Sequence, residues 1–221
     1  TLNLTDGSNE HSIIVDDHQT EPLTTVRIYS DVSTYEDYSL DVTYNATTNT
    51  YSASGDVLTL IAGTASSEIF EGTDADDRIF AADGDDVLRG GAGDDVLVGG
   101  DGIDLANYKD DTSDLTVDLS TGVASSSGSG EDILSEIENI AAGSGDDTLI
   151  GDSGDNRLSG GAGDDIFYGS DGNDELVGGT GTDTVNYGSE TSAVNVNLNR
   201  GRASGEDIGV DKLTGIEDVV G

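Results

Sequence analysis

The chain has 221 residues, with 46 acidic side chains against 8 basic ones and a formal net charge of −38. Nucleic acids and anionic membrane surfaces are bound through clustered Lys and Arg, so we expect neither as a partner. No run is long enough to cross a bilayer, so we expect no membrane insertion. The charge favours a cation as the partner, and the absence of cysteine excludes disulfides and Cys-ligated metal sites.

Residues 1–62 are predicted to form a small β element, or the end of a neighbouring domain. Alternating residues at 25–29 and 39–44 indicate antiparallel strands, with a turn at 45–49. The tyrosines between residues 29 and 51 could contact a sugar or a peptide, but packing within a thin β element is the favoured interpretation. His11 and His18 could hold a metal, but surface positions in a loop are favoured.

Two runs of a nine-residue pattern follow. The pattern is Gly-Gly-x-Gly-x-Asp-x-apolar-x, and its clearest copies start at Gly90 and Gly160. Five copies fill residues 63–107 (block 1) and five fill residues 142–186 (block 2). All ten have an acidic or amide residue at position six and an apolar residue at position eight. Because a disordered acidic segment keeps no such period, the pattern indicates a repeat fold.

The residue types of this pattern suit calcium. Ca²⁺ takes roughly 6–8 oxygen ligands from carboxylates and carbonyls, and glycine allows the tight turn that brings backbone carbonyls close to an ion. One such turn cannot surround an ion, but two stacked turns can. Carboxylates are also frequent at position five, where they are predicted to be solvated charge on the outer face of the turn. The candidate metal ligands are the position-six residues Glu68, Asp77, Asp86, Asp95, Asp104, Asp147, Asn156, Asp165, Asp174 and Asp183.

Residues 108–141 and 187–221 form two related spacers. Residues 115–119 match residues 194–198 after a shift of 79 positions, as block 1 matches block 2. Each spacer opens with period-two alternation, which predicts a strand. A Gly-containing turn follows, and a short apolar segment at 133–140 leads into block 2. We expect each spacer to cap one block and to lead into the next.

The blocks resemble the RTX family of bacterial proteins exported by type I secretion, and the spacers resemble segments between RTX blocks in large adhesins. In that family two nonapeptides make one turn of a parallel β-roll, and each calcium ion lies between repeats n and n+2. The resemblance implies about three ions per block, about six in all. The implied pairs are Asp77–Asp95, Asp86–Asp104, Asp147–Asp165 and Asp165–Asp183, with weaker sites at Glu68–Asp86 and Asn156–Asp174.

The sequence thus predicts an all-β fold of two calcium-loaded parallel β-roll blocks with β-rich spacers, preceded by a small antiparallel β element. Each repeat buries one apolar side chain, whereas ordering glycine-rich turns costs much backbone entropy. We therefore expect the blocks to be unfolded without calcium. No catalytic motif is visible, so we expect no enzyme activity.

The favoured function is an extracellular calcium-binding module that folds on binding calcium after secretion, as part of a large bacterial surface adhesin. One alternative is a ligand-binding domain that recognises a cell-surface glycan, a peptide or a protein. Another is the accessory C-terminal module of a secreted hydrolase or epimerase. We expect a monomeric fragment of a larger chain, because no signal peptide opens it and the pattern stops at Gly221.

Overall fold

The computed structural model describes residues 2–5, 10–13, 26–30, 34–38, 42–45, 50–53 and 60–221, and side chains from residue 61 onward. Within these residues the fold is all-β, as predicted, and its one helix is a short 3-10 turn. No helix in these ranges is long and apolar enough to span a membrane. The side chains of His11, His18 and the tyrosines at 29–51 lie outside the described part, so those interpretations stay predictions.

Antiparallel strand pairs precede block 1, as the sequence predicts. They are β1 (Leu2–Thr5) with β2 (Glu10–Ile13), β3 (Val26–Ser30) with β4 (Thr34–Tyr38), and β5 (Val42–Asn45) with β6 (Thr50–Ala53). β6 and β7 (Leu60–Ala62) also pair in parallel with the first two strands of block 1. The parallel sheets therefore begin before residue 63, and a domain boundary at residue 62 stays a prediction.

Each repeat of block 1 contributes one short parallel strand, and successive repeats join opposite sheets. Sheet one contains β8 (Ile69–Glu71), β10 (Val87–Arg89) and β12 (Leu105–Asn107). Sheet two contains β9 (Arg78–Asp83) and β11 (Val96–Asp101). Leu88 lies opposite Phe70, two repeats earlier in the chain. Two nonapeptides therefore make one turn of a parallel roll.

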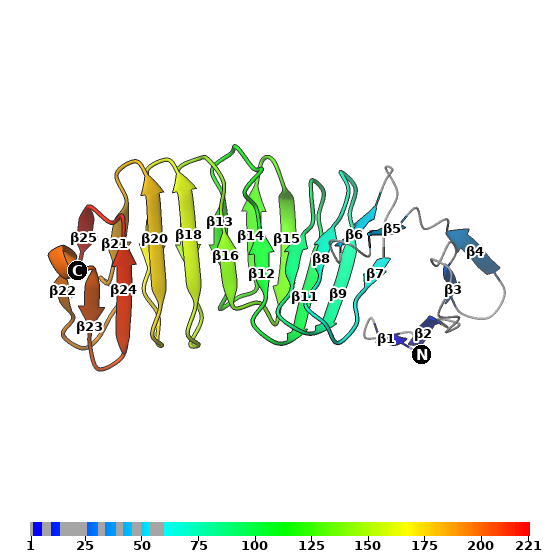
Figure 1. The fold of residues 1–221 in the computed structure, drawn as a ribbon, viewed down its shortest axis with the longest axis horizontal. Coiled ribbons are helices and arrows are strands. Elements are labelled where there is room, and N and C mark those ends of the chain that lie inside the picture. The colour runs from blue at the N-terminus through cyan, green and yellow to red at the C-terminus, as the bar shows by residue number, and fades with distance from the viewer. Residues whose placement is uncertain are drawn as a thin grey trace.

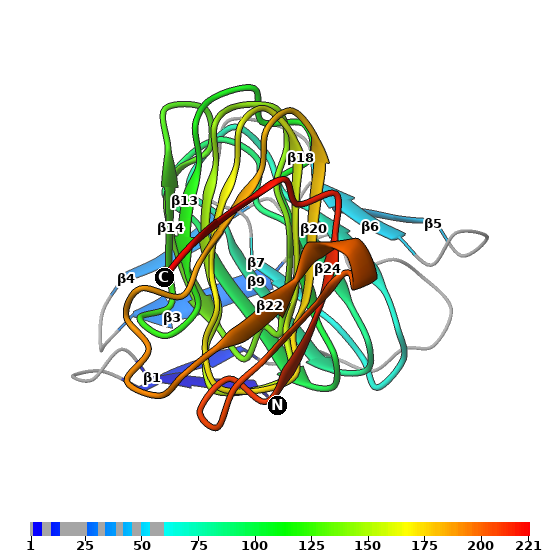
Figure 2. The same ribbon diagram turned by 90° about the vertical axis from the view of Figure 1, so that its left-hand side faces the viewer.

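Block 2 repeats this arrangement with the sheets exchanged. Sheet two contains β17 (Thr148–Ile150), β19 (Ile166–Tyr168) and β21 (Thr184–Asn186). Sheet one contains β18 (Arg157–Ala162) and β20 (Glu175–Thr180). Phe167 lies opposite Leu149, again with a register of two repeats. In the view along the row of strands, the two sheets form facing walls joined by turns (Figure 2).

The core is a narrow layer of apolar side chains that both sheets contribute from their facing sides. Strand alternation turns position eight inward, and all ten residues at that position are at most 1% exposed. The core continues through the first spacer with Val117 and Ala124, and through the second with Ala203 and Leu213. A core this narrow leaves the turns at the roll's edges to hold the stack together.

The first spacer adds a three-stranded antiparallel meander to sheet two. Its strands are β13 (Thr116–Asp118), β14 (Val123–Ser126) and β15 (Gly130–Ser135). β15 pairs with β11 of block 1, and β13 pairs with β17 of block 2. In sheet one a single strand, β16 (Asn139–Ala141), lies between β12 and β18. The two blocks thus form one continuous row of strands (Figure 1).

The second spacer places its meander in the opposite sheet. β22 (Asn195–Asn197), the 3-10 helix η1 (Leu198–Arg200), β23 (Arg202–Ser204) and β24 (Val210–Thr214) follow in order, and the three strands join sheet one beside β20. β25 (Asp218–Val220) extends sheet two beside β21. The duplicated units therefore have the same strand order but differ by half a turn of the roll, so that corresponding strands lie in opposite sheets.

Candidate metal centres

The ten predicted ligands lie in the turns at the roll's edges, and all are at most 4% exposed. In each predicted pair, the backbone N–H at position six of one repeat donates to Oδ1 at position six of the repeat one turn further on. The donor–acceptor distances are 2.7 Å for Asp77–Asp95, 2.8 Å for Asp86–Asp104, 2.9 Å for Asp147–Asp165 and 3.0 Å for Asp165–Asp183. The two pairs predicted to be weaker, Glu68–Asp86 and Asn156–Asp174, also form, at 2.6 and 2.9 Å.

The turns are of two kinds, which differ in the second carboxylate oxygen of the position-six residue. We name a turn open where this oxygen has no hydrogen-bond partner, and closed where the position-six side chain is held by a further donor. In six turns this Oδ2 atom is buried and has no hydrogen-bond partner within the described residues. Leaving an ionised carboxylate oxygen buried and unpaired is costly. These six oxygens therefore fit a bound cation. The open turns are those of Asp86, Asp95, Asp104, Asp147, Asp165 and Asp183.

Burial raises the pKa of aspartates along the whole roll, in closed turns such as that of Asp174, where the pKa is about 7, as well as in the open turns. Burial raises the pKa of Asp95 and Asp165 to about 7, with neighbouring carboxylates adding to the shift. Burial likewise raises the pKa of Asp86, Asp104 and Asp147 to about 6. A carboxyl group with a raised pKa lacks a compensating positive charge. A divalent cation beside each of these groups would supply it.

The other four predicted ligands lie in closed turns, where a backbone N–H at position two binds the position-six side chain. Thr64 donates to Glu68 at 2.8 Å, Thr73 to Asp77 at 2.6 Å and Asp152 to Asn156 at 2.8 Å, and Ser170 donates to the Asp174 carboxylate. In the open turns position two is instead glycine or alanine, and in five of the six it has positive φ. Position two therefore distinguishes an open turn from a closed one.

Glycine at position one also has a direct role in the open turns. A Cβ atom on Gly90 would overlap Oδ2 of Asp95, and a Cβ on Gly160 would overlap Oδ2 of Asp165. The carboxylate thus lies in the space that any other side chain would need. Glycine stands at this position in four of the six open turns, whereas Ala81 and Ala142 stand there in the turns of Asp86 and Asp147.

The position-five carboxylates do more than the predicted solvation of the turns. They are exposed, but each accepts a backbone N–H from the next turn of the roll. Asp94 donates to Asp76 at 2.9 Å, Asp164 to Asp146 at 2.9 Å, and Thr182 to Asp164 at 2.7 Å. A second row of hydrogen bonds therefore runs along the outside of the turns.

The spacers continue the position-six rows, which the sequence reasoning missed. Asp95 donates to Asp132 at 2.9 Å, and Asp174 donates to Asp211 at 3.2 Å. Glu138 and Glu217 extend the other two rows, with donors at 2.7 and 3.0 Å. The signal was present: residues 128–134 read Gly-Ser-Gly-Glu-Asp-Ile-Leu, which is the nonapeptide pattern from position two to position eight.

In the spacer turns of Asp132 and Asp211, a tyrosine hydroxyl donates to the second carboxylate oxygen, which has no partner in the open turns. The Tyr108 hydroxyl donates to Oδ2 of Asp132 at 2.8 Å, and the Tyr187 hydroxyl donates to Oδ2 of Asp211 at 2.6 Å. Both tyrosines are at most 6% exposed. Burial and the adjacent carboxylate raise the pKa of the Tyr108 hydroxyl, which keeps it protonated as a donor. These two turns are closed without metal.

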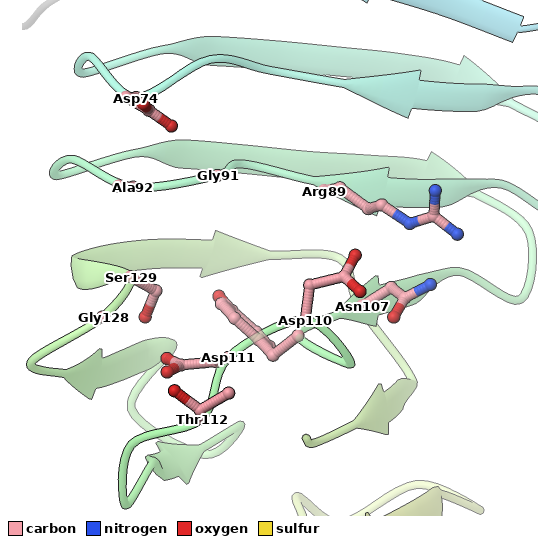
Figure 3. Close-up of a pocket in the computed structure, with 11 residues that line it drawn as sticks. Asp74, Arg89, Gly91, Ala92, Asn107, Asp110, Asp111, Thr112, Gly128 and Ser129 are labelled. Carbon is pink, nitrogen blue, oxygen red and sulfur yellow. The ribbon is translucent and has the colours of Figure 1, made fainter. Parts of the chain in front are cut away.

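An open hollow of about 320 Å³ lies between the turns of block 1 and the loop that begins the first spacer. Asp74 and Arg89 line it from block 1, and Asp110 and Asp111 line it from the spacer (Figure 3). Arg89 is also paired with Glu71. Among residues 61–221, the hollow included, no group of three or more His, Cys, Asp or Glu side chains is placed to hold an ion, so backbone carbonyls would have to complete the coordination of a cation at an open turn.

The fold and the rows of buried carboxylates define a calcium-binding parallel β-roll module of nonapeptide repeats. A family model described as the RTX calcium-binding nonapeptide repeat (four copies) matches residues 71–106, 134–167 and 150–185. This description names a calcium-binding repeat and no reaction. The match agrees with the resemblance seen in the sequence for the blocks.

Two further comparisons complete this picture. No curated protein matches the chain. Among solved structures, the crystal structure of extracellular lipase LipA from Serratia marcescens is similar, with 17% identity and a TM-score of 0.32. The aligned region covers 74% of this chain and 38% of that chain, so this chain spans less than two fifths of the lipase. At that TM-score the likeness says nothing about activity.

Proposed function

We propose that this chain is an extracellular module that folds on binding calcium after secretion, and that it belongs to a large bacterial surface adhesin. The observation that carries the calcium part is the set of six buried carboxylate oxygens without a partner. The spacers between the blocks support the adhesin assignment, through their resemblance to adhesin segments. Type I secretion is proposed on the same resemblance.

About six ions are proposed, one for each open turn. Asp86, Asp95 and Asp104 would hold them in block 1, and Asp147, Asp165 and Asp183 in block 2. Calcium supplies positive charge and binds backbone carbonyls together with carboxylates. Glu68 and Asp77 support these sites by stacking, because they donate their backbone N–H groups to Asp86 and Asp95. Asn156 and Asp174 donate instead to Asp174 and Asp211, whose turns are closed.

Folding and calcium binding are linked in this proposal. Without a cation the folded roll would bring together buried carboxylates in a chain of net charge −38, and this repulsion favours the unfolded state. Sites with Kd of about 10⁻⁴–10⁻³ M suit extracellular calcium. At a tenfold excess over Kd each site adds about 1.4 kcal/mol of stability, so the sites act together to shift the equilibrium.

Circular dichroism during a calcium titration tests the proposal. We expect an unfolded spectrum in excess EGTA and a cooperative rise of β structure as calcium is added. A β-rich spectrum that persists in EGTA would contradict coupled folding. Asp95→Asn should shift the calcium midpoint upward, because it removes the charge and keeps the Oδ1 acceptor for Asp77. Asp94→Asn, one residue away and exposed, is the matched control and should leave the midpoint nearly unchanged.

A further inference from the structure

Asp147 is the one open turn that has no nonapeptide repeat beneath it. Its carboxylate is 1% exposed, and its Oδ2 has no hydrogen-bond partner. The turn below belongs to the first spacer, where Leu115 donates its backbone N–H to Oδ1 of Asp147 at 2.9 Å. The carboxylate is therefore held against residues 111–115, which lie outside the segments that match the repeat family.

The spacer turn copies the hydrogen bonds of a nonapeptide turn. Asp146 donates to Asp114 Oδ1 at 2.9 Å, as Asp164 donates to Asp146 one turn further on. Ser144 donates to the Asp111 carbonyl at 2.9 Å, as Ala162 donates to the Gly143 carbonyl at 3.0 Å. Asp111 and Asp114 thus occupy positions two and five of a turn with Leu115 at position six.

The backbone carbonyls of this spacer turn also lie in the same places. A Cβ on Gly143 would overlap the carbonyl of Asp111, and a Cβ on Gly145 would overlap that of Ser113. One turn further on, the same test brings Gly161 and Gly163 against the carbonyls of Gly143 and Gly145. The spacer therefore offers block 2 the carbonyl oxygens that one repeat offers the next.

We propose that a calcium ion binds at the junction of the first spacer and block 2, between the Asp147 carboxylate and the carbonyls of the spacer turn at residues 111–114. This inference rests on the proposed function. The ion fastens the spacer to the block that follows it. The junction with block 1 is different, because there Tyr108 closes the turn of Asp132 without metal. Leu115 supplies no carboxylate, so this junction site binds calcium more weakly than a site with two stacked aspartates.

Hydrogen exchange on the whole chain, with and without calcium, tests this site. At a calcium concentration ten times Kd, the Leu115 and Ser144 amides should be about tenfold better protected in the unaltered chain than in Asp147→Asn. Asp147→Asn removes the charge but keeps an oxygen that accepts the Leu115 N–H. It should bind one ion fewer by equilibrium dialysis and lose the calcium-induced protection of the spacer turn. Asp183→Asn, at the far end of the same row, should lose one ion and keep that protection.

The outcomes separate the junction site from the proposed function. If the unaltered chain binds no calcium, the proposed function itself fails. If it binds calcium but the spacer turn is equally protected without it, or if Asp147→Asn leaves that protection intact, only the junction site is overturned.

Discussion

At the scale of single residues, the second carboxylate oxygen of the position-six aspartates has three kinds of surroundings in this roll. In open turns it is buried without a partner, as in Asp95. In closed turns of the blocks it accepts a backbone N–H from position two, as in Asp77. In the spacers it accepts a tyrosine hydroxyl, as in Asp132. All three carboxylates are equally buried, so the donor beside the oxygen, and not its exposure, decides whether a turn needs a cation.

Tyr108→Phe should destabilise the chain whether or not calcium is bound. The substitution leaves the Asp132 carboxylate buried without its donor, which costs about 1–3 kcal/mol. Urea unfolding at saturating calcium measures the loss, and the number of bound ions should stay the same. Tyr168→Phe, on the partly exposed β19, is the control and should change stability little. Equal effects of the two substitutions would argue against a specific role for the Tyr108 hydroxyl.

Gly90→Ala should weaken one calcium site and the fold together. The new Cβ would overlap Oδ2 of Asp95, and forcing an extra carbon into a packed site costs about 1–3 kcal/mol. Gly154→Ala is a matched control, because its Cβ would meet only Asp152 Oδ1 at 3.2 Å. Thermal unfolding with calcium should show a lowered Tm for the first variant only. Similar Tm values for both would contradict the proposed packing.

The sequence predicted the position-six and position-eight residues because each has a strong local signal. All ten position-eight residues are in the core, and the predicted position-six pairs do stack. The residue at position two, such as Thr73 or Gly91, separates closed turns from open ones in the sequence, but the meaning of this difference follows only from the hydrogen bonds that the coordinates reveal. It also could not pair Tyr108 with Asp132, which lie 24 residues apart and meet only through the antiparallel meander.

At the scale of elements, closed turns should bind no calcium of their own. Asp165→Asn removes a carboxylate with an open oxygen, so the number of bound ions should fall by one. Asp174→Asn changes a carboxylate that Ser170 already holds, so the number should stay the same. Equilibrium dialysis of both variants against the unaltered chain measures the difference. Loss of an ion from Asp174→Asn would show that hydrogen bonding at position two does not close a turn.

The spacers were only partly predictable. The alternation at 115–119 predicted β13, and the apolar segment at 133–140 covers the second half of β15 and the first two residues of β16. The partner strand β14 and the nonapeptide turn around Asp132 were missed. That turn starts at Ser127, one residue out of phase with the nine-residue period of block 1. The shift arises because the β13–β14 hairpin, which has no counterpart in the blocks, lies between block 1 and this turn.

At the scale of the whole molecule, the metal-free roll should be more stable in acid. The open aspartates titrate near 3.8 when unfolded, whereas burial raises the folded pKa of Asp95 and Asp165 to about 7 and that of Asp86, Asp104 and Asp147 to about 6. Between these values the folded state binds more protons. Its stability is therefore greatest below pH 4 and is lost as pH rises through about 6–7.

Circular dichroism in calcium-free buffer at pH 4.5 and pH 7.5 measures this effect. We expect more β structure at pH 4.5, because protons neutralise the same carboxylates that calcium would neutralise. With calcium present the order should reverse, since protons compete with the ion for these oxygens and raise the apparent Kd. A calcium-free spectrum that loses β structure on acidification would contradict the assignment of the raised pKa values.

The exchange of sheets between the two spacers has a mechanical consequence. Each spacer adds three strands to one sheet and one strand to the other, and at about 4.8 Å per strand the difference is a wedge of roughly 10 Å on one side. Identical wedges on the same side would bend a string of such units into an arc. Because the second meander lies in sheet one and the first in sheet two, the two bends oppose each other. An array of this unit would run as a straight rod.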